Sequence, residues 1–199
     1  MIQCLEITAV NIPSLRKSIA IGAVSFAVVS LIVFATVAFG ERWMYRNIGE
    51  LGAYLIWTVL FIALGGAAFG PLLVGRWRLP RFYLLYGAAF FAYAIGWVAV
   101  FFTMQDQRGE WLGSLVGTVL MALVFAAGFR VMRSTFMFST LLFIAHSVGY
   151  FTGAMLHARL GGSPAGMLLW GLAYGLGLGA GIGAVLHFAQ SQRWTQESS

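Results

Sequence analysis

Charged side chains are scarce in this sequence, and acidic ones are the scarcest. Asp, Glu, Lys and Arg make up 9% of the 199 residues, and only six of these are acidic. About a quarter of a typical soluble domain is charged, whereas 60% of this chain is hydrophobic. This balance excludes an ordinary soluble domain. It predicts an all-α, polytopic membrane protein.

Cysteine and histidine are also few. A lone Cys4 excludes an internal disulfide and a cysteine metal cluster. His146 and His157 are eleven residues apart, or roughly 16 Å along one helix, so they cannot share a metal. His187 lies near the C-terminal end of a different apolar run, whereas His146 is near the centre of its own. We therefore expect no metal and no cofactor, with a haem held by His146 alone as the alternative.

Long apolar runs without any charged residue are abundant. There are six, each about 18 residues or longer, which is enough to cross a bilayer as a helix: Ser18 to Phe39, Leu51 to Leu73, Phe82 to Thr103, Leu112 to Phe129, Thr135 to His157, and Ala165 to Phe188. Their short connections predict a compact bundle of six transmembrane helices over residues 18–188. Residues 1–17 are then an N-terminal segment that could lie at the interface, and residues 189–199 a tail.

The basic residues predict an orientation. Eight of the twelve fall on one predicted side of the membrane: Arg16, Lys17, Arg76, Arg78, Arg81, Arg130, Arg133 and Arg193. By the positive-inside rule this side, with both termini, is cytoplasmic. We expect a multi-pass protein of a bacterial inner (plasma) membrane. The net charge of +6 then indicates contact with anionic lipids and no nucleic-acid partner.

Glycines recur at four-residue spacing, which places them on one face of a helix. The longest series is in the last run, and shorter pairs occur in the second and fifth; these predicted packing residues are Gly66, Gly70, Gly149, Gly153, Gly171, Gly175, Gly179 and Gly183. Small residues allow close helix packing in a bilayer. The alternative is that some of these faces line a cavity or seat a flat ligand.

Polar residues inside the apolar runs are few, and none is a carboxylate. This absence argues against a proton pump, because pumps commonly carry protons on intramembrane Asp or Glu. The candidate binding or cavity residues are His146, Ser147, Tyr150, Thr58 and Tyr174. A neutral His146 that simply bonds to a neighbouring helix is the structural alternative.

The second and sixth runs resemble each other. Aligning Trp57 with Trp170 also pairs Phe61 with Tyr174, and Gly66 with Gly179. Related, glycine-interrupted spans are typical of transporter binding sites, although convergent packing of small residues explains the pattern equally well.

The segment from Ala145 to Gly153 resembles the AHxxGxxxG segment that carries the catalytic histidine of rhomboid intramembrane proteases. The sequence lacks the GxSG motif of that family, and its histidine lies in the fifth run instead of the sixth. We therefore do not infer protease activity, and no catalytic residues are assigned. A pair of Ser114 and His146 is the only candidate for such chemistry.

Two functional hypotheses follow. The first is a small channel or carrier for a neutral or anionic solute, lined by the glycine faces and the hydroxyl groups of the fifth run. The second is a non-catalytic subunit or assembly partner of a larger membrane complex, in which the glycine-rich helix holds a lipid or a macrocyclic cofactor. Other membrane subunits or self-association are the partners that we expect, besides the bilayer.

Overall fold

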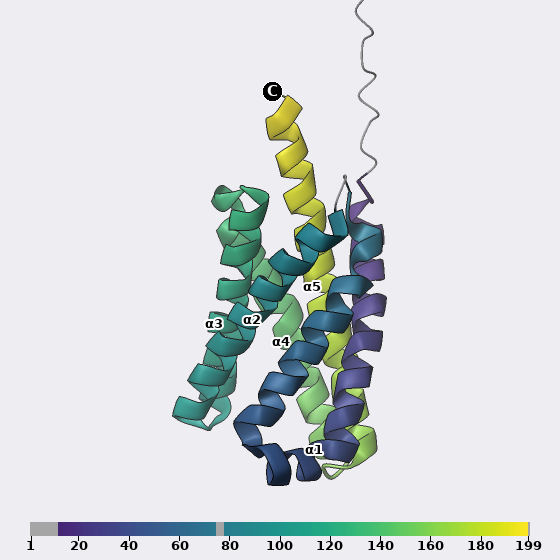
Figure 1. Ribbon diagram of the computed structural model, residues 1–199, viewed down its shortest axis with the longest axis vertical. Coiled ribbons are helices and arrows are strands. Elements are labelled where there is room, and N and C mark those ends of the chain that lie inside the picture. The colour runs from purple at the N-terminus through teal and green to yellow at the C-terminus, as the bar shows by residue number, and fades with distance from the viewer. Residues whose placement is uncertain (1–11, 75–77, 199) are drawn as a thin grey trace, which may run out of the picture.

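The computed structural model describes residues 12–74 and 78–198, and every regular element in these ranges is helical (Figure 1). The α-helices are α1 (Leu15–Ala68), α2 (Arg78–Met104), α3 (Gln107–Phe129), α4 (Thr135–Arg159) and α5 (Pro164–Ser198), with short 3-10 helices η1 (Gly70–Leu72) and η2 (Met132–Ser134). All five α-helices are long and apolar enough to cross a membrane. The prediction of an all-α, multi-pass protein is confirmed at this level.

The structure has five such helices in the described ranges where the sequence predicts six. The difference lies in α1, which contains the first two apolar runs. Gly49 has non-helical dihedral angles inside α1, with φ 75° and ψ 167°, a conformation that glycine adopts readily. The helix turns back there, so the rings of Phe26 and Phe61 lie 5.6 Å apart. We call residues 15–48 the first arm of α1 and residues 50–68 its second arm (Figure 1).

The remaining links are short and have recognisable ends. Asp106 begins α3, because its side chain accepts a hydrogen bond from the Gly109 N–H at 2.8 Å. Arg130 ends α3 in the left-handed conformation, with φ 60°. Gly161 and Gly162 also have positive φ between α4 and α5. Residues 1–11, which include Cys4 and most of the predicted N-terminal segment, lie outside the described residues, as do residues 75–77, which include Arg76.

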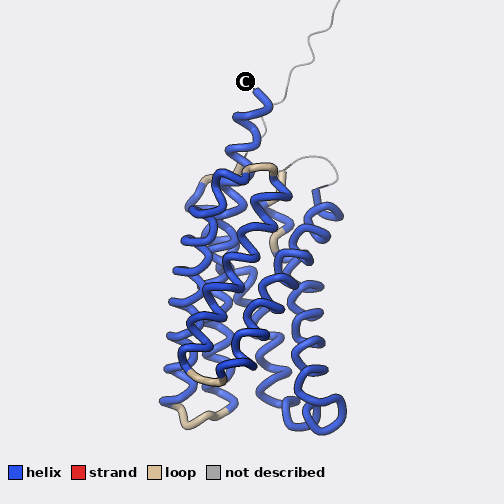
Figure 2. Tube along the Cα trace, turned by 90° about the vertical axis from the view of Figure 1, so that its left-hand side faces the viewer, coloured by secondary structure: helices blue, strands red, loops and turns tan. Residues whose placement is uncertain are grey.

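Helix α5 lies at the centre of the bundle. It packs mainly against α1 on one side and α4 on the other, while α2 packs mainly against α3. Leu178, Ile182 and Leu186 of α5 are fully buried. Toward its C-terminus α5 extends past the other helices (Figure 2), and it stays helical to Ser198, through residues that the sequence assigns to a tail.

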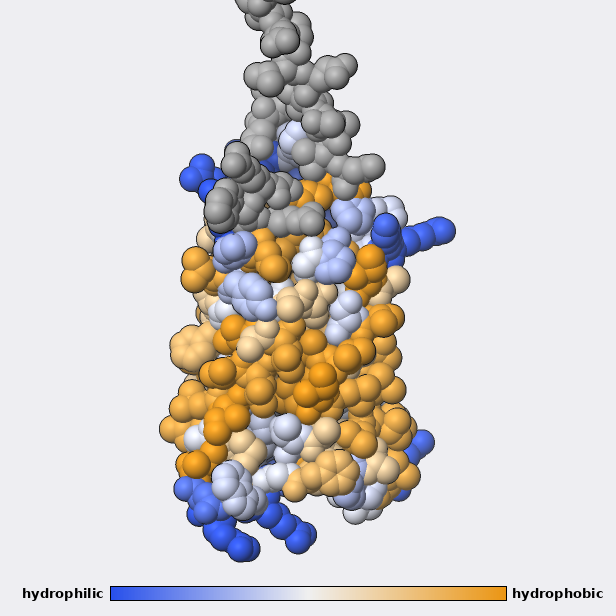
Figure 3. All heavy atoms as spheres, turned by 45° about the vertical axis from the view of Figure 1, so that its right-hand side comes forward, coloured by the Kyte–Doolittle hydropathy of each residue, from blue (hydrophilic) through white to orange (hydrophobic). Residues whose placement is uncertain are grey.

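The sides of the bundle are apolar. Figure 3 shows a broad hydrophobic band between two ends that carry hydrophilic side chains. Large apolar side chains of the helices are strongly exposed, including Leu84 at 78% and Phe136 at 85%. Such a surface is suited to contact with the hydrocarbon of a lipid bilayer, so the predicted contact with lipid is supported.

Candidate functional site

A cavity of about 270 Å³ lies between both arms of α1 and helices α2, α4 and α5. Most of its wall is aromatic: Phe34, Tyr45, Tyr54, Trp57, Phe61, Phe90, Tyr93, Trp97, Tyr150, Trp170 and Tyr174. The other wall residues are Val33, Val37, Glu41, Thr58, Ala94, Val98 and Met167. The wall thus consists mainly of aromatic and aliphatic side chains, with one carboxylate and several hydroxyl and indole N–H groups. We call this space the aromatic cavity.

The aromatic cavity reaches the end of the bundle that contains Gly49. Val37, Glu41 and Met167 also line a neighbouring hollow, which includes Arg42 and the Gly162–Pro164 link between α4 and α5. Glu41 is therefore shared between the two spaces and stands at their junction. Arg42 belongs only to the outer hollow.

The wall is held by ring contacts between helices. Tyr150 of α4 meets Trp170 of α5 edge to face, with ring centroids 5.3 Å apart. Tyr54 and Trp57, both in the second arm of α1, are 5.5 Å apart and also edge to face. Such geometries are favourable for aromatic pairs. The ring of Phe34 in α1 also lies 6.1 Å from that of Trp170, so aromatic contacts link α1, α5 and α4 around the cavity.

A hydrogen-bonded polar group lies at the inner end of the cavity. The hydroxyl of Tyr93 is 2.7 Å from Nε2 of His146, and the Tyr174 hydroxyl donates to the Tyr93 oxygen at 3.3 Å. The imidazole also stacks on Tyr150, with centroids 5.5 Å apart and planes at 13°. His146 is completely buried and lies behind the three tyrosines, which themselves line the cavity.

Past this polar group the bundle is closed by packed rings. Phe26, Phe69 and Tyr86 are fully buried. Phe26 contacts the wall residues Phe61 at 5.6 Å and Phe90 at 6.4 Å between centroids. In the described residues the cavity is therefore blind on this side.

Several buried polar atoms have no hydrogen-bond partner within the described part of the chain. They include Nδ1 of His146 and Oγ of Ser147, and the indole nitrogens of Trp57, Trp97 and Trp170. Buried polar atoms without partners are uncommon and costly. All three tryptophans belong to the wall of the aromatic cavity, so unpaired hydrogen-bond donors are concentrated around it.

The structure gathers most of the candidate polar residues in this one region. Thr58, Tyr150 and Tyr174 line the cavity, and His146 contacts the rings of both tyrosines. The Thr58 hydroxyl donates to the Tyr54 carbonyl at 2.8 Å within its own helix. Ser147 is buried at 6% exposure but is not part of the wall.

The glycine series on α5 meets two different helices. A Cβ atom on Gly179 or Gly183 would overlap the carbonyl oxygen of Gly22 or of Ser18, both in the first arm of α1. A Cβ on Gly175 would come within 2.6 Å of the Ala27 Cα, and one on Gly171 would overlap Phe34. On the opposite side of α5, Gly177 and Gly181 approach α4 at Ala145 and other residues. The glycine faces are therefore covered by α1 and α4, without space for a lipid or macrocycle.

The other glycine pairs also face neighbouring helices. Gly149 and Gly153 of α4 approach α5, where a Cβ on Gly153 would lie 2.8 Å from the Trp170 Cα. Gly66 packs under the ring of Tyr83. A Cβ on Gly70 would lie 3.5 Å from the end of the Leu79 side chain, which is an ordinary van der Waals distance.

Ser114 and His146 do not form a catalytic pair. The Ser114 hydroxyl donates to the Glu110 carbonyl in its own helix at 2.7 Å, and within the described residues no hydrogen bond joins it to His146. The described residues also contain no group of three His, Cys, Asp or Glu side chains placed to hold a metal. His187 instead lies 2.8 Å, through Nδ1, from the Pro13 carbonyl.

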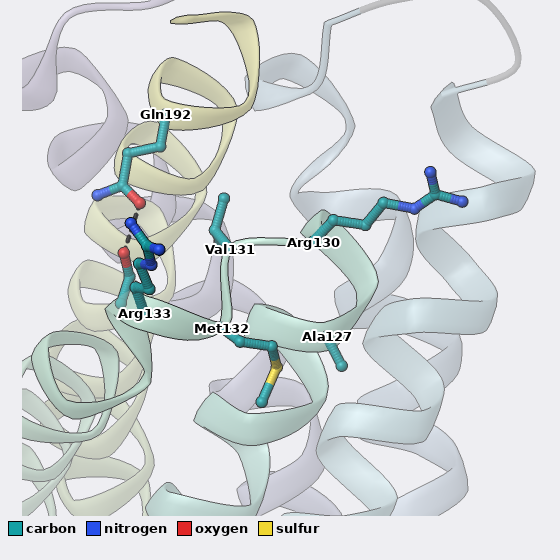
Figure 4. A pocket seen from close by; sticks show the side chains of 7 residues that line it. Ala127, Arg130, Val131, Met132, Arg133 and Gln192 are labelled. Atoms are coloured by element: carbon teal, nitrogen blue, oxygen red, sulfur yellow. Dashed lines mark hydrogen bonds between the residues drawn. The ribbon is translucent and has the colours of Figure 1, made fainter. Parts of the chain in front are cut away.

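A second hollow, of about 530 Å³, lies at the other end of the bundle beside the link between α3 and α4. Arg130, Arg133 and Gln192 line it, and the Ser134 hydroxyl donates to the Gln192 side chain. Figure 4 shows Arg133 beside Gln192, whereas Arg130 extends away from them. The two guanidinium groups do not converge on one point, so this hollow offers a basic surface without a built anion site.

Sequence reasoning missed part of the site. It did not single out Trp97, Tyr54 or Glu41, because aromatic residues are common in cores and at membrane interfaces, and Glu41 falls outside every apolar run. One signal was present, since the paired positions Trp57/Trp170 and Phe61/Tyr174 of the two similar runs all line the aromatic cavity.

Comparison with known protein families, curated proteins and solved structures found no match to this chain. The functional argument therefore depends on the site itself.

Proposed function

We propose that this protein crosses the membrane six times and is a carrier that binds a small organic solute in its aromatic cavity. The observation that supports this proposal is the cavity: it is blind, it is lined from four helices, and its wall holds polar groups that lack partners. Concave, mostly apolar spaces with a few placed polar groups are typical of small-molecule sites.

The shape of α1 supports six passes. A straight helix of 54 residues would be about 80 Å long, far longer than the roughly 30 Å hydrocarbon core of a bilayer. Because α1 reverses at Gly49, its two arms are suited to cross separately. With α2 to α5 this gives the six-pass domain at 18–188, and the positive-inside rule then places both termini in the cytoplasm of a bacterial inner membrane.

The closed inner end favours a carrier over an open channel. Among the described residues, the packed rings of Phe26, Phe69 and Tyr86 leave no path beyond the polar group at His146. In a carrier, such a barrier opens only in an alternate state, while the site stays near the middle of the membrane. In this orientation the aromatic cavity faces the side of the membrane opposite the cytoplasm.

The alternative role, as a subunit of a larger complex, has less support. Its motivation was a glycine-rich surface available to a partner helix, lipid or cofactor. The glycines on α5 are instead used by α1 and α4 of the same chain.

The test is binding of small solutes to a protein in which the cavity is filled. Ala94 lies in the cavity wall on α2, so Ala94→Phe would occupy part of the space. Ala99→Phe is the matched control, because Ala99 lies on the same helix with its side chain exposed. Three probes share one branched body and differ in charge: choline, 3,3-dimethyl-1-butanol and 3,3-dimethylbutanoate. None of them absorbs where tryptophan is excited.

We expect saturable changes in tryptophan fluorescence of the purified protein with at least one probe, since Trp57, Trp97 and Trp170 surround the site. Ala94→Phe should abolish the response and Ala99→Phe should retain it. The proposal is wrong if no probe binds, or if Ala94→Phe binds as the wild type does. Saturable uptake of the bound probe into proteoliposomes is required for a carrier, and binding without uptake would leave only a binding protein.

A further inference from the structure

We infer that the aromatic cavity selects organic cations, in particular a substituted ammonium group with a small apolar body. This inference rests on the proposed function and specifies the chemical class of its solute. It differs from the sequence-based expectation of a neutral or anionic solute, because the charge of the wall was not visible until the wall residues were known.

The formal charge of the wall is negative. Glu41 is the one ionisable carboxylate among the lining residues, and the wall contains no Lys, Arg or His. Glu41 is half-buried, so its field is less screened by water than that of a fully exposed side chain. An anion inside the cavity would meet a like charge, because the guanidinium group of Arg42 belongs to the outer hollow and not to the wall. A cation would be attracted at the point where the cavity joins the outer hollow.

The aromatic faces act in the same direction. The π-face of Trp, Tyr or Phe attracts a cation, most strongly when water is excluded, and recognition of quaternary ammonium groups by aromatic cages is the established use of this effect. Tyr45 and Trp57, from the two arms of α1, have centroids 6.1 Å apart, and Tyr54 lies 5.5 Å from Trp57. All three rings line the same space as Glu41.

The rings and the carboxylate thus combine two features. Several aromatic side chains stand around one end of the cavity, and a single acid stands at its junction with the outer hollow. Deeper in, the wall is formed by Phe61, Phe90 and the hydroxyl-bearing Tyr93 and Tyr174, which suit an apolar body with one polar substituent. An ammonium group would therefore rest against the α1 rings that line the cavity, with its body directed toward the inner tyrosines.

The experiment compares the three shape-matched probes, which differ in charge, by tryptophan fluorescence. The full chain is kept in an uncharged maltoside detergent, because phosphocholine detergents would compete. We expect choline to bind about tenfold more tightly than 3,3-dimethyl-1-butanol, and 3,3-dimethylbutanoate to bind most weakly. Glu41→Gln should lower choline affinity by about five- to tenfold and leave the alcohol unchanged. Asp106→Asn is the control, since Asp106 is an exposed acid at the start of α3, outside the wall, and asparagine also caps a helix; it should change either affinity by less than about twofold.

A second variant separates the ring contribution from the charge. Trp57→Leu keeps an apolar side chain but removes the π-face, so it should weaken choline more than the alcohol. The melting temperature of each variant without ligand shows that it folds. Equal affinities for choline and the alcohol, or tighter binding of the anion, would overturn the cation inference while the cavity remains a binding site. Loss of all binding in the wild type would overturn the proposed function as well.

Discussion

The contact between α5 and the first arm of α1 gives a sharp prediction for Gly179. A Cβ atom at this position would lie 2.7 Å from the Cβ of Phe26, in addition to overlapping the Gly22 carbonyl. Carbon atoms pack best at about 3.5–4.0 Å, so the helices would have to separate by about 1 Å. Overpacking of this kind costs about 1–3 kcal/mol.

The matched control is Gly40→Ala. Gly40 is also inside a helix, but a Cβ there would meet no atom within 4 Å. Replacing Gly by Ala in a helix gains up to about 1 kcal/mol from intrinsic propensity, and this gain applies to both positions. The difference between the two variants therefore isolates the packing cost. We expect Gly179→Ala to be less stable than Gly40→Ala by about 1–3 kcal/mol.

The assay is reversible unfolding in mixed detergent micelles, followed by tryptophan fluorescence, from which the free energies of unfolding are compared. If Gly179→Ala were stabilised as much as Gly40→Ala, the close approach of α5 to α1 would be refuted. The glycine series would then need another explanation.

Three further predictions concern stability. The Gln190 side chain accepts from the Val74 N–H at 2.9 Å and donates to the Leu72 carbonyl at 3.0 Å. Gln190→Leu should therefore lower the free energy of unfolding by about 1–3 kcal/mol for each buried group that it leaves unpaired. A neutral effect in the same unfolding assay would contradict that role. Tyr93→Phe should cost more than Tyr174→Phe, about 1–3 against about 0.5–1.5 kcal/mol, because only the former leaves His146 Nε2 without its partner; equal losses would argue against this order of bonds. Gly49→Ala should lower the melting temperature, since its φ of 75° disfavours a side chain, and an unchanged melting temperature would show that the turn adapts.

Much of the fold could be predicted from composition. Apolar runs without charges identify membrane-spanning segments because every backbone group in lipid must be satisfied within a helix. Five helical elements appear where six separate runs were expected, because α1 contains two of the runs and only Gly49 between them has non-helical dihedral angles. The sequence also indicated that the glycines of α5 permit close contact. It could not indicate that α1 and α4 are the two helices in contact, because pairing depends on tertiary structure.

The candidate site was only partly predictable. His146, Tyr150, Tyr174 and Thr58 stand out as polar residues in apolar runs, and they lie in or beside the cavity. The tryptophans do not stand out, because aromatic residues are common both in cores and at membrane interfaces. Glu41 falls outside every apolar run. Its place in the wall follows from the return of α1 at Gly49, which brings the second arm alongside the first.

The central claim is that a solute binds in the aromatic cavity, and photolabelling tests it most directly. A diazirine-bearing derivative of the tightest-binding probe is irradiated with the purified protein, and labelled residues are mapped by mass spectrometry with and without excess unlabelled probe. We predict protectable labelling at cavity residues such as Trp57, Trp97 and Trp170. Labelling confined to exposed positions on the sides of the bundle, such as Leu84 and Phe136, would contradict the account.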